Sequence, residues 1–195
     1  MMVAALLLNG CADGGRALQN TEEKDSVAVE MDSGAKSVNE SDELSESAEK
    51  KITPAATRQG ALDLYDKAFS QHDFAYLRAA CIEPYGQENV DFLLANGLMS
   101  EEEYWGAYDD SQGSYYKIGV FESYSSEITD EKQIEETKTI EEELFQTYGY
   151  SCIVQEAYEV TYKQIAAGTE GTAVNEGYRA QVVRVDDSWY ILKML

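Results

Sequence analysis

Aromatic residues are absent from the first third of this 195-residue chain, and this absence limits which part can fold. The first Tyr, Phe or Trp is Tyr65. A segment without aromatic side chains buries too little apolar surface to offset the entropy that it loses when its backbone becomes ordered. We therefore expect a disordered acidic linker over residues 12–56 and one folded domain over residues 57–195, a usual size for a domain.

The chain begins with an apolar run that ends in Leu8-Asn9-Gly10-Cys11, and polar residues follow at once. This pattern resembles the lipobox of bacterial lipoproteins, which implies that the thiol of Cys11 carries a diacylglycerol. A signal peptide has a positively charged start, and no Lys or Arg precedes Cys11. Residues 1–11 are therefore interpreted as a truncated signal segment whose start lies upstream. The alternative is a cytosolic N-terminus in which Leu-x-Gly-Cys occurs by chance.

A lipidated Cys11 predicts an extracytoplasmic protein that is anchored by lipid to the outer face of the cytoplasmic membrane. Two acyl chains are enough for stable anchoring. A flexible linker between the anchor and the domain is the usual arrangement in surface lipoproteins, so the lipobox and the linker support one another.

The formal net charge of the whole chain is −22, from 37 acidic and 15 basic residues. Such a surface repels phosphate groups, so we expect no nucleic-acid partner and no membrane binding through a basic face. The simplest interpretation is that the acidity keeps an exported domain soluble. A role in binding a cation or a basic partner is the alternative.

The three cysteines are Cys11, Cys81 and Cys152, with no Cys-x-x-Cys pair, and His72 is the single histidine. This set does not fit a zinc site. No glycine-rich phosphate loop is present, and residues 109–114 match a calcium loop only in part. We therefore expect no metal and no cofactor. Cys81 and Cys152 are expected to be buried thiols, with a disulfide between them as the alternative in an oxidising compartment.

The first half of the domain has the apolar spacing of helices. Apolar residues recur at spacings of three and four before Tyr115, which predicts four helices. Thr57, or Thr53-Pro54, can begin the first helix, and Asp73 can cap the second. Ser100 begins a capping box that opens the fourth helix.

The second half of the domain alternates as strands do. We predict a strand over residues 116–124, a helix over 130–148 that ends at Gly149, and three strands in the remaining residues. Residues 169–177 are expected to form a loop. Short connections make the last three strands an antiparallel meander. The predicted fold class is therefore α+β, with N-terminal helices packed on a curved antiparallel sheet.

Two N-terminal helices joined at Gln71-His72-Asp73, a helix in the middle of the chain and a closing meander resemble the NTF2-like, cystatin-related fold. Residues 58–195 are more narrowly similar to uncharacterised lipoproteins of Gram-positive gut bacteria. The segments that carry this second resemblance are Pro84-Tyr85, Asn96–Glu103, Tyr148-Gly149, Ala157–Val160 and Trp189-Tyr190. The resemblance implies a fold and a cell-surface address, but no activity. NTF2-like domains often pair through their sheets, so a homodimer is possible.

NTF2-like domains typically form a conical cavity between sheet and helices, and some relatives place a carboxylate or a histidine in it as a general base. Glu122 falls on the apolar side of a predicted strand and is the expected buried carboxylate, unless the strand end twists into solvent. Asp63, Asp66 and His72 are expected in solvent. The possible aromatic lining of the cavity, which ordinary core packing would also explain, comprises Tyr65, Phe69, Tyr158, Tyr162, Tyr178 and Trp189.

No catalytic motif is recognisable in the sequence. There is no Gly-x-Ser-x-Gly motif, and no histidine is available to activate Cys81 or Cys152. We therefore expect a non-enzymatic module that binds an envelope peptide, glycan or protein. The alternative is an isomerase or dehydratase that uses the cavity, an idea that rests on the fold alone.

Overall fold

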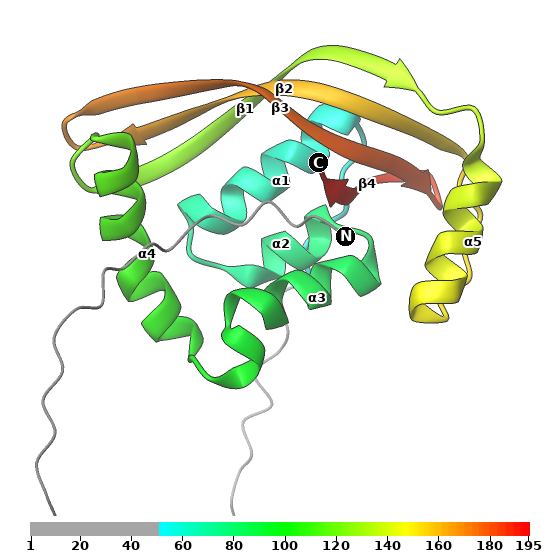
Figure 1. Cartoon of the computed structure of the whole chain (residues 1–195), viewed down its shortest axis with the longest axis horizontal. Coiled ribbons are helices and arrows are strands. Elements are labelled where there is room, and N and C mark those ends of the chain that lie inside the picture. The colour runs from blue at the N-terminus through cyan, green and yellow to red at the C-terminus, as the bar shows by residue number, and fades with distance from the viewer. Residues whose placement is uncertain (1–50) are drawn as a thin grey trace, which may run out of the picture. The chain divides into compact units, whose positions relative to one another are not determined.

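A four-stranded antiparallel sheet arches over a layer of helices (Figure 1). The computed structural model describes residues 51–195. The helices are α1 (Arg58–Ser70), α2 (Phe74–Ala80), α3 (Glu83–Leu93), the short 3-10 helix η1 (Ala95–Gly97), α4 (Glu101–Tyr116) and α5 (Thr137–Tyr148). The strands are β1 (Phe121–Gln133), β2 (Glu156–Gly168), β3 (Gly171–Val185) and β4 (Ser188–Met194).

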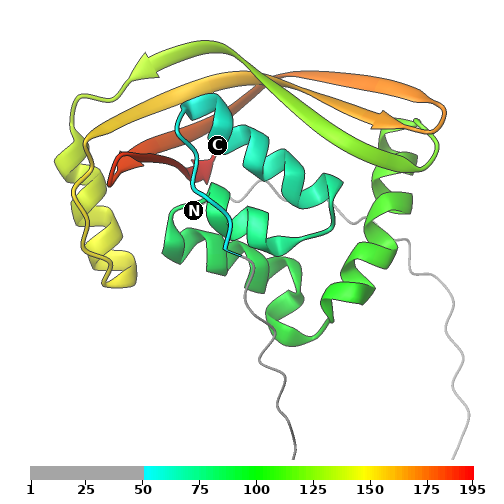
Figure 2. The same cartoon turned by 180° about the vertical axis from the view of Figure 1, so that it is seen from behind.

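The strands lie in the order β1-β2-β3-β4, so each strand pairs with the next one along the chain. β1 and β4 are therefore the two edges of the sheet. Figures 1 and 2 show α1 to α4 on one face of the sheet and α5 at one of its ends. The predicted α+β class, with N-terminal helices packed on an antiparallel sheet, is confirmed.

Local sequence signals set the starts of α1, α2 and α4 and the end of α5 where the pattern predicted them. The side chains of Thr57 and Asp73 accept hydrogen bonds from the first turns of α1 and α2. Ser100 and Glu103 form both bonds of a capping box at the start of α4. Gly149 ends α5 in the left-handed conformation, with φ 66°. These caps define where the helices begin and end through contacts between residues that are close in sequence.

The predicted helix over residues 130–148 is shorter than expected. Residues 130–133 belong to β1, and α5 begins only at Thr137. β1 continues because it pairs with β2 as far as Gln133, which lies opposite Tyr158. Pairing with a neighbouring strand therefore overrides the weak helical pattern of this charged segment.

The predicted loop over residues 169–177 is mostly strand. β2 and β3 remain paired up to Gly168 opposite Gly171, so the turn is only Thr169-Glu170. The backbone N–H of Glu170 also donates to the carbonyl of Ile118 at 2.8 Å, which ties this hairpin to the segment after α4. The sequence of residues 169–177 is typical of a loop because it is rich in Gly and polar side chains, but hydrogen bonding to β2 makes most of the segment a strand.

The core lies in two clusters on the two faces of the sheet. The larger cluster joins the helices of the first half to the concave face, with fully buried Leu62, Phe74 and Leu77. In the smaller cluster α5 packs against the other face through Ile140 and Leu144. α5 therefore covers the other face only at one end of the sheet (Figure 1).

The folded domain begins earlier than the predicted boundary at residue 57. Ala55, assigned to the linker, is only 6% exposed, and its carbonyl accepts from Trp189 N–H at 2.8 Å. Ile52 also packs against the core. Residues 51–56 are thus a short extension of the domain beside β4. The signal segment, Cys11 and the linker up to residue 50 lie outside the described residues.

Neither described cysteine forms a disulfide. Cys81 is buried, Cys152 is partly buried, and both are free thiols, so the disulfide alternative is wrong. Burial raises the pKa of the Cys81 thiol far above its ordinary value, which makes this thiol unreactive. Separately, no helix within residues 51–195 has both the length and the apolar character needed to span a bilayer.

At Gly113, α4 packs directly against the backbone of Gly119, in the segment that follows the helix. A Cβ added there would lie 1.8 Å from the carbonyl oxygen of Gly119, whereas a Cβ at Gly106 on the same helix meets nothing within 4 Å. We expect Gly113→Ala to lower the free energy of unfolding by about 1–3 kcal/mol through overpacking. Gly106→Ala, the matched control, should raise it by up to about 1 kcal/mol. Chemical denaturation of the two variants measures both, and equal effects would contradict the close approach.

Candidate functional site

The space between the sheet and the helices is filled with aromatic rings. Phe69 on α1 is the centre of this packing, with ring centroids of four neighbours at 5.1 to 6.3 Å. These neighbours are Tyr65, Trp105, Tyr108 and Tyr124. Such edge-to-face and tilted contacts are those of a packed core. The rings around Phe69 therefore stabilise the fold and leave this part of the interior closed.

The six aromatic residues expected to line one cavity form three separate pairs. Tyr65 contacts Phe69 at 5.1 Å, Tyr158 contacts Trp189 at 5.8 Å, and Tyr162 contacts Tyr178 at 5.7 Å, measured between ring centroids. Only Trp189 of the six lines the groove described below. The core-packing interpretation therefore suits Tyr65 and Phe69 best.

Glu122 is exposed, so the expectation of a buried carboxylate at this position is wrong. The cause is an irregularity in the ladder. The register between β1 and β2 shifts between Phe121 and Ser123, and Glu122 is the residue left unpaired. Phe121 is buried in its place. Simple alternation cannot reveal such a shift.

The buried carboxylate of this domain is Asp66 on α1, which is only 4% exposed. Its Oδ1 accepts from Ser126 Oγ on β1 and from Gln164 Nε2 on β2, both at 3.1 Å. Its Oδ2 is buried without a partner in the structure. Burial, the largest cause, raises the pKa of Asp66 to about 6, while the bonds from Ser126 and Gln164 oppose the shift. Asp66 therefore titrates close to neutral pH.

Asp66 was expected in solvent because it lies beside the apolar stripe of the first helix. The residues that cover it, Ser126 on β1 and Gln164 on β2, come from far along the chain. Asp63, one turn earlier, is exposed as expected. His72 is also exposed in its turn, where it stacks on Trp105 at 5.1 Å and pairs with Asp109 at 2.9 Å.

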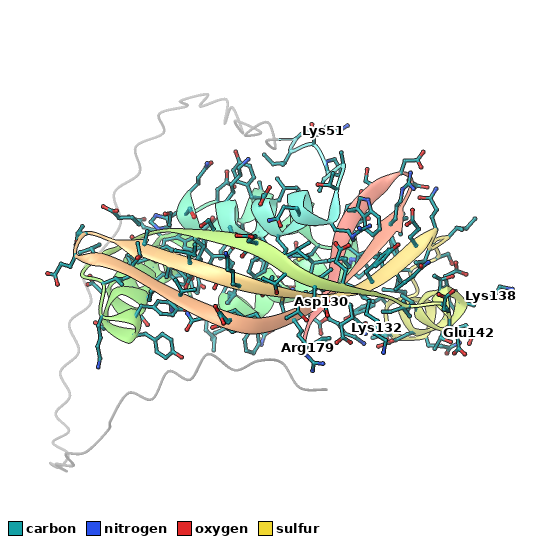
Figure 3. All side chains as sticks on the ribbon, turned by 90° about the horizontal axis from the view of Figure 1, so that it is seen from above. Lys51, Asp130, Lys132, Lys138, Glu142 and Arg179 are labelled. Carbon is teal, nitrogen blue, oxygen red and sulfur yellow. The ribbon has the colours of Figure 1, made fainter. Side chains whose placement is uncertain are left out.

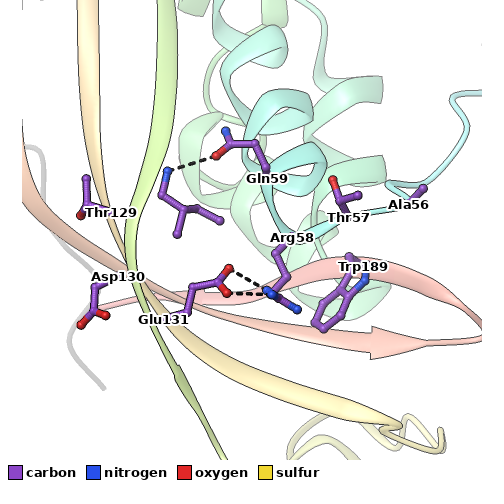
Figure 4. Close-up of a pocket in the computed structure, with 9 residues that line it drawn as sticks. Ala56, Thr57, Arg58, Gln59, Thr129, Asp130, Glu131 and Trp189 are labelled. Carbon is purple, nitrogen blue, oxygen red and sulfur yellow. Dashed lines mark hydrogen bonds and ion pairs between the residues drawn. The ribbon is translucent and has the colours of Figure 1, made fainter.

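A surface groove of about 630 Å³ lies where the start of α1 meets β1 and β4 (Figure 4). Arg58 is its central residue, with a bidentate ion pair to the Glu131 carboxylate in which both N–O distances are 2.7 Å. The guanidinium also lies 4.2 Å from the ring centroid of Tyr158 and 5.0 Å from that of Trp189. The complete lining is Ala56, Thr57, Arg58, Gln59, Ile128, Thr129, Asp130, Glu131 and Trp189.

Arg58 is held in place by these contacts. Hydrogen bonding to Glu131 raises the pKa of Arg58 and lowers that of Glu131. The pair is partly exposed, so it contributes to the position of the two side chains more than to stability. The Thr57 hydroxyl accepts from Gly60 N–H, and the Thr129 hydroxyl donates to the carbonyl of Thr161. The groups left for a ligand are therefore the carboxylate of Asp130 and the backbone of β1 beyond Ile128.

Gln59, also in the groove, bonds to the edge of β1. Its Nε2 donates to the carbonyl of Ser126 at 2.7 Å, and its Oε1 accepts from Ile128 N–H at 3.0 Å. A side-chain amide here makes the two bonds that a neighbouring strand would make. Farther along α1, Ser70 Oγ accepts from Tyr124 N–H at 3.0 Å.

Within residues 51–195 no cluster of three or more His, Cys, Asp or Glu side chains could hold a metal ion. No family model matches the chain, and no match is found among curated proteins or solved structures. The site can therefore be interpreted only from its own geometry.

The raised pKa of Asp66 makes stability depend on pH. A folded pKa of about 6 against an ordinary value of 3.8 means that the folded state binds this proton more tightly. The stabilisation from Asp66 is therefore fully present below pH 4 and is lost as the pH rises through 6, a loss of about 3 kcal/mol. Asp66→Asn, which imitates the protonated acid, should be more stable than the wild type at pH 7.5 but not at pH 3.5. Urea unfolding at both pH values measures this difference.

Asp110→Asn is the control for this experiment, because it removes the same charge from an exposed position on α4, away from Asp66. It corrects for the general effect of the acidic surface on stability. If both variants change the free energy of unfolding equally at both pH values, Asp66 is not the group that titrates.

Proposed function

We propose that this chain is a lipid-anchored extracytoplasmic binding module, and that the groove beside Arg58 and Trp189 takes a segment of an envelope partner. The observation that carries the proposal is that the open space of the domain lies at its surface and not between the sheet and the helices. The rings around Phe69 close the interior, whereas the groove is open at the surface and has its polar groups in fixed positions.

Among the expected ligands of such a module, a peptide segment fits this groove better than a glycan. One wall of the groove is a strand edge, which offers backbone hydrogen bonds to another backbone. Glycan sites usually present an exposed aromatic face, but Trp189 is only 6% exposed. A peptide of a partner protein is therefore the proposed ligand.

The finer fold class is also part of the proposal. A helix pair before a curved antiparallel sheet that closes in a meander supports an NTF2-like, cystatin-related domain. The lipobox residues up to Cys11 support the anchor. We do not extend the proposal to an isomerase or dehydratase. Glu122 is exposed, the buried carboxylate of Asp66 does not line the groove, and the acids that do line it, Asp130 and Glu131, are exposed.

The lipid anchor predicts where the full chain is found in a bacterial host with an upstream signal peptide supplied. The wild-type chain should fractionate with membranes and incorporate labelled fatty acid. Cys11→Ser should lose both properties, since the thiol accepts the lipid. Cys152→Ser is the control and should behave as the wild type. A Cys11→Ser chain that remains in the membrane fraction would contradict lipid anchoring.

The groove predicts that peptides selected on the domain from a displayed library share one site. Asp130→Arg places a long side chain of opposite charge in the groove wall and should weaken the selected peptides about tenfold or more. Asp110→Arg makes the same change on the exposed side of α4, away from the groove, and should leave binding unchanged. Calorimetric titration measures both affinities. Peptides that bind the two variants alike would refute the groove as the site.

A further inference from the structure

The edge of β1 is covered by α1 over only part of its length. The outward backbone groups of Tyr124, Ser126 and Ile128 bond to side chains of α1. The cover ends near Ile128, because α1 begins at Arg58 and the Arg58 side chain bonds to the carboxylate of Glu131 and not to its backbone.

Beyond Ile128, the backbone groups of β1 that point away from β2 belong to odd-numbered residues and no longer to even-numbered ones. The register with β2 shifts between Ile128 and Asp130, so Thr129 is an extra residue. The N–H of Ile134 donates to Ala157 on the β2 side. Alternation from Ile134 directs the backbone groups of Gln133 and Glu131 away from β2, toward the free edge.

These outward groups are accessible. Asp130, Glu131, Lys132 and Gln133 are all exposed, and Figure 3 labels Asp130 and Lys132 along this stretch of β1. Within residues 51–195, no side chain of α1 bonds the outward backbone of Glu131 or Gln133. An exposed strand edge whose outward backbone groups are not bonded is a template for pairing with another chain.

The charge along this edge indicates what kind of chain can pair with it. Residues 127–136 contain five acidic residues and one basic residue, Lys132. Glu127 pairs with Lys163 and Glu131 with Arg58, while Asp130, Glu135 and Glu136 form no ion pair within the described residues. A second copy of β1 would bring like charges together across the new ladder, which is unfavourable. A basic segment would bring opposite charges together.

We propose that the edge of β1 at Glu131–Gln133 binds an extended, lysine- or arginine-bearing segment of a partner protein as a fifth strand of the sheet. The proposal rests on the proposed function, because this edge continues the wall of the same groove. It adds the backbone geometry of the ligand and the sign of its charge.

The test uses the full chain carrying Cys11→Ser, so that no lipid is present, and a blocked short peptide that alternates lysine with valine. Binding should slow hydrogen exchange at the amides of Glu131 and Gln133. A matched glutamate–valine peptide should not bind. The lysine peptide with alternate backbone nitrogens methylated keeps its charge and loses its ladder bonds, so it should not protect these amides.

Gln133→Pro tests the same edge from the protein side. Proline removes an outward N–H and leaves the bonds to β2, so the sheet is retained. Losing one such bond should weaken the lysine peptide about fivefold to tenfold. Gln133→Ala keeps the N–H and should bind as the wild type does.

Each other result would overturn strand addition at β1. Protection over residues 172–178 would place the added strand on β3, whose edge is also open there because the last residues of the chain bond to β3 only from Arg179 onward. Protection without peptide that grows with protein concentration would show pairing between two copies. Binding that Asp130→Arg abolishes, with the amides of Glu131 and Gln133 unprotected, would reject strand addition and leave the groove proposal intact.

Discussion

The rest of the structure depends on α1 standing in for the strand that is missing beside β1. Gln59, Asp66 and Ser70 are spaced by seven and four residues and so lie on one face of the helix. They bond in turn to Ile128 and Ser126, to Ser126, and to Tyr124. Without them, backbone groups of an edge strand would be covered by a helix and left without partners, at a cost of a lost hydrogen bond each.

The contact between α1 and β1 explains why a carboxylate is buried at all. An apolar residue at position 66 would fill the same space, but it could not bond to Ser126 and Gln164 and so could not distinguish one position of α1 along β1 from another. Only one placement of the helix lets its three polar side chains reach alternate residues of the strand. Burial of Asp66 therefore lowers stability at neutral pH, as its raised pKa shows, while it helps to define the register of the helix on the sheet.

How much of this could be predicted from the sequence depends on how local the deciding interaction is. Caps at Thr57, Asp73 and Ser100 act within three residues, and they were predicted correctly. The α+β class also follows, because it depends on two periodicities that each span a few residues.

The features of the site are different, since they depend on residues distant in sequence. Asp66 is buried by a residue 98 positions away, and Arg58 is fixed by one 73 positions away. The irregularity that exposes Glu122 is a property of two strands together. These contacts cannot be inferred from any single segment of the sequence. For this reason Glu122, and not Asp66, is the buried carboxylate that the sequence predicts, and the sequence does not predict the groove.

The acidic surface and the open edge of β1 are best understood together. A long exposed strand edge normally invites association with other copies of the same chain, and charge along the edge is a usual protection against it. Here the charge has one sign, so the protection is selective: it opposes pairing with an identical strand and favours pairing with a basic one. An interior filled by aromatic rings leaves little room for a small substrate, whereas the uncovered edge of β1 lies beside a groove, which is where we propose that a segment of another protein binds.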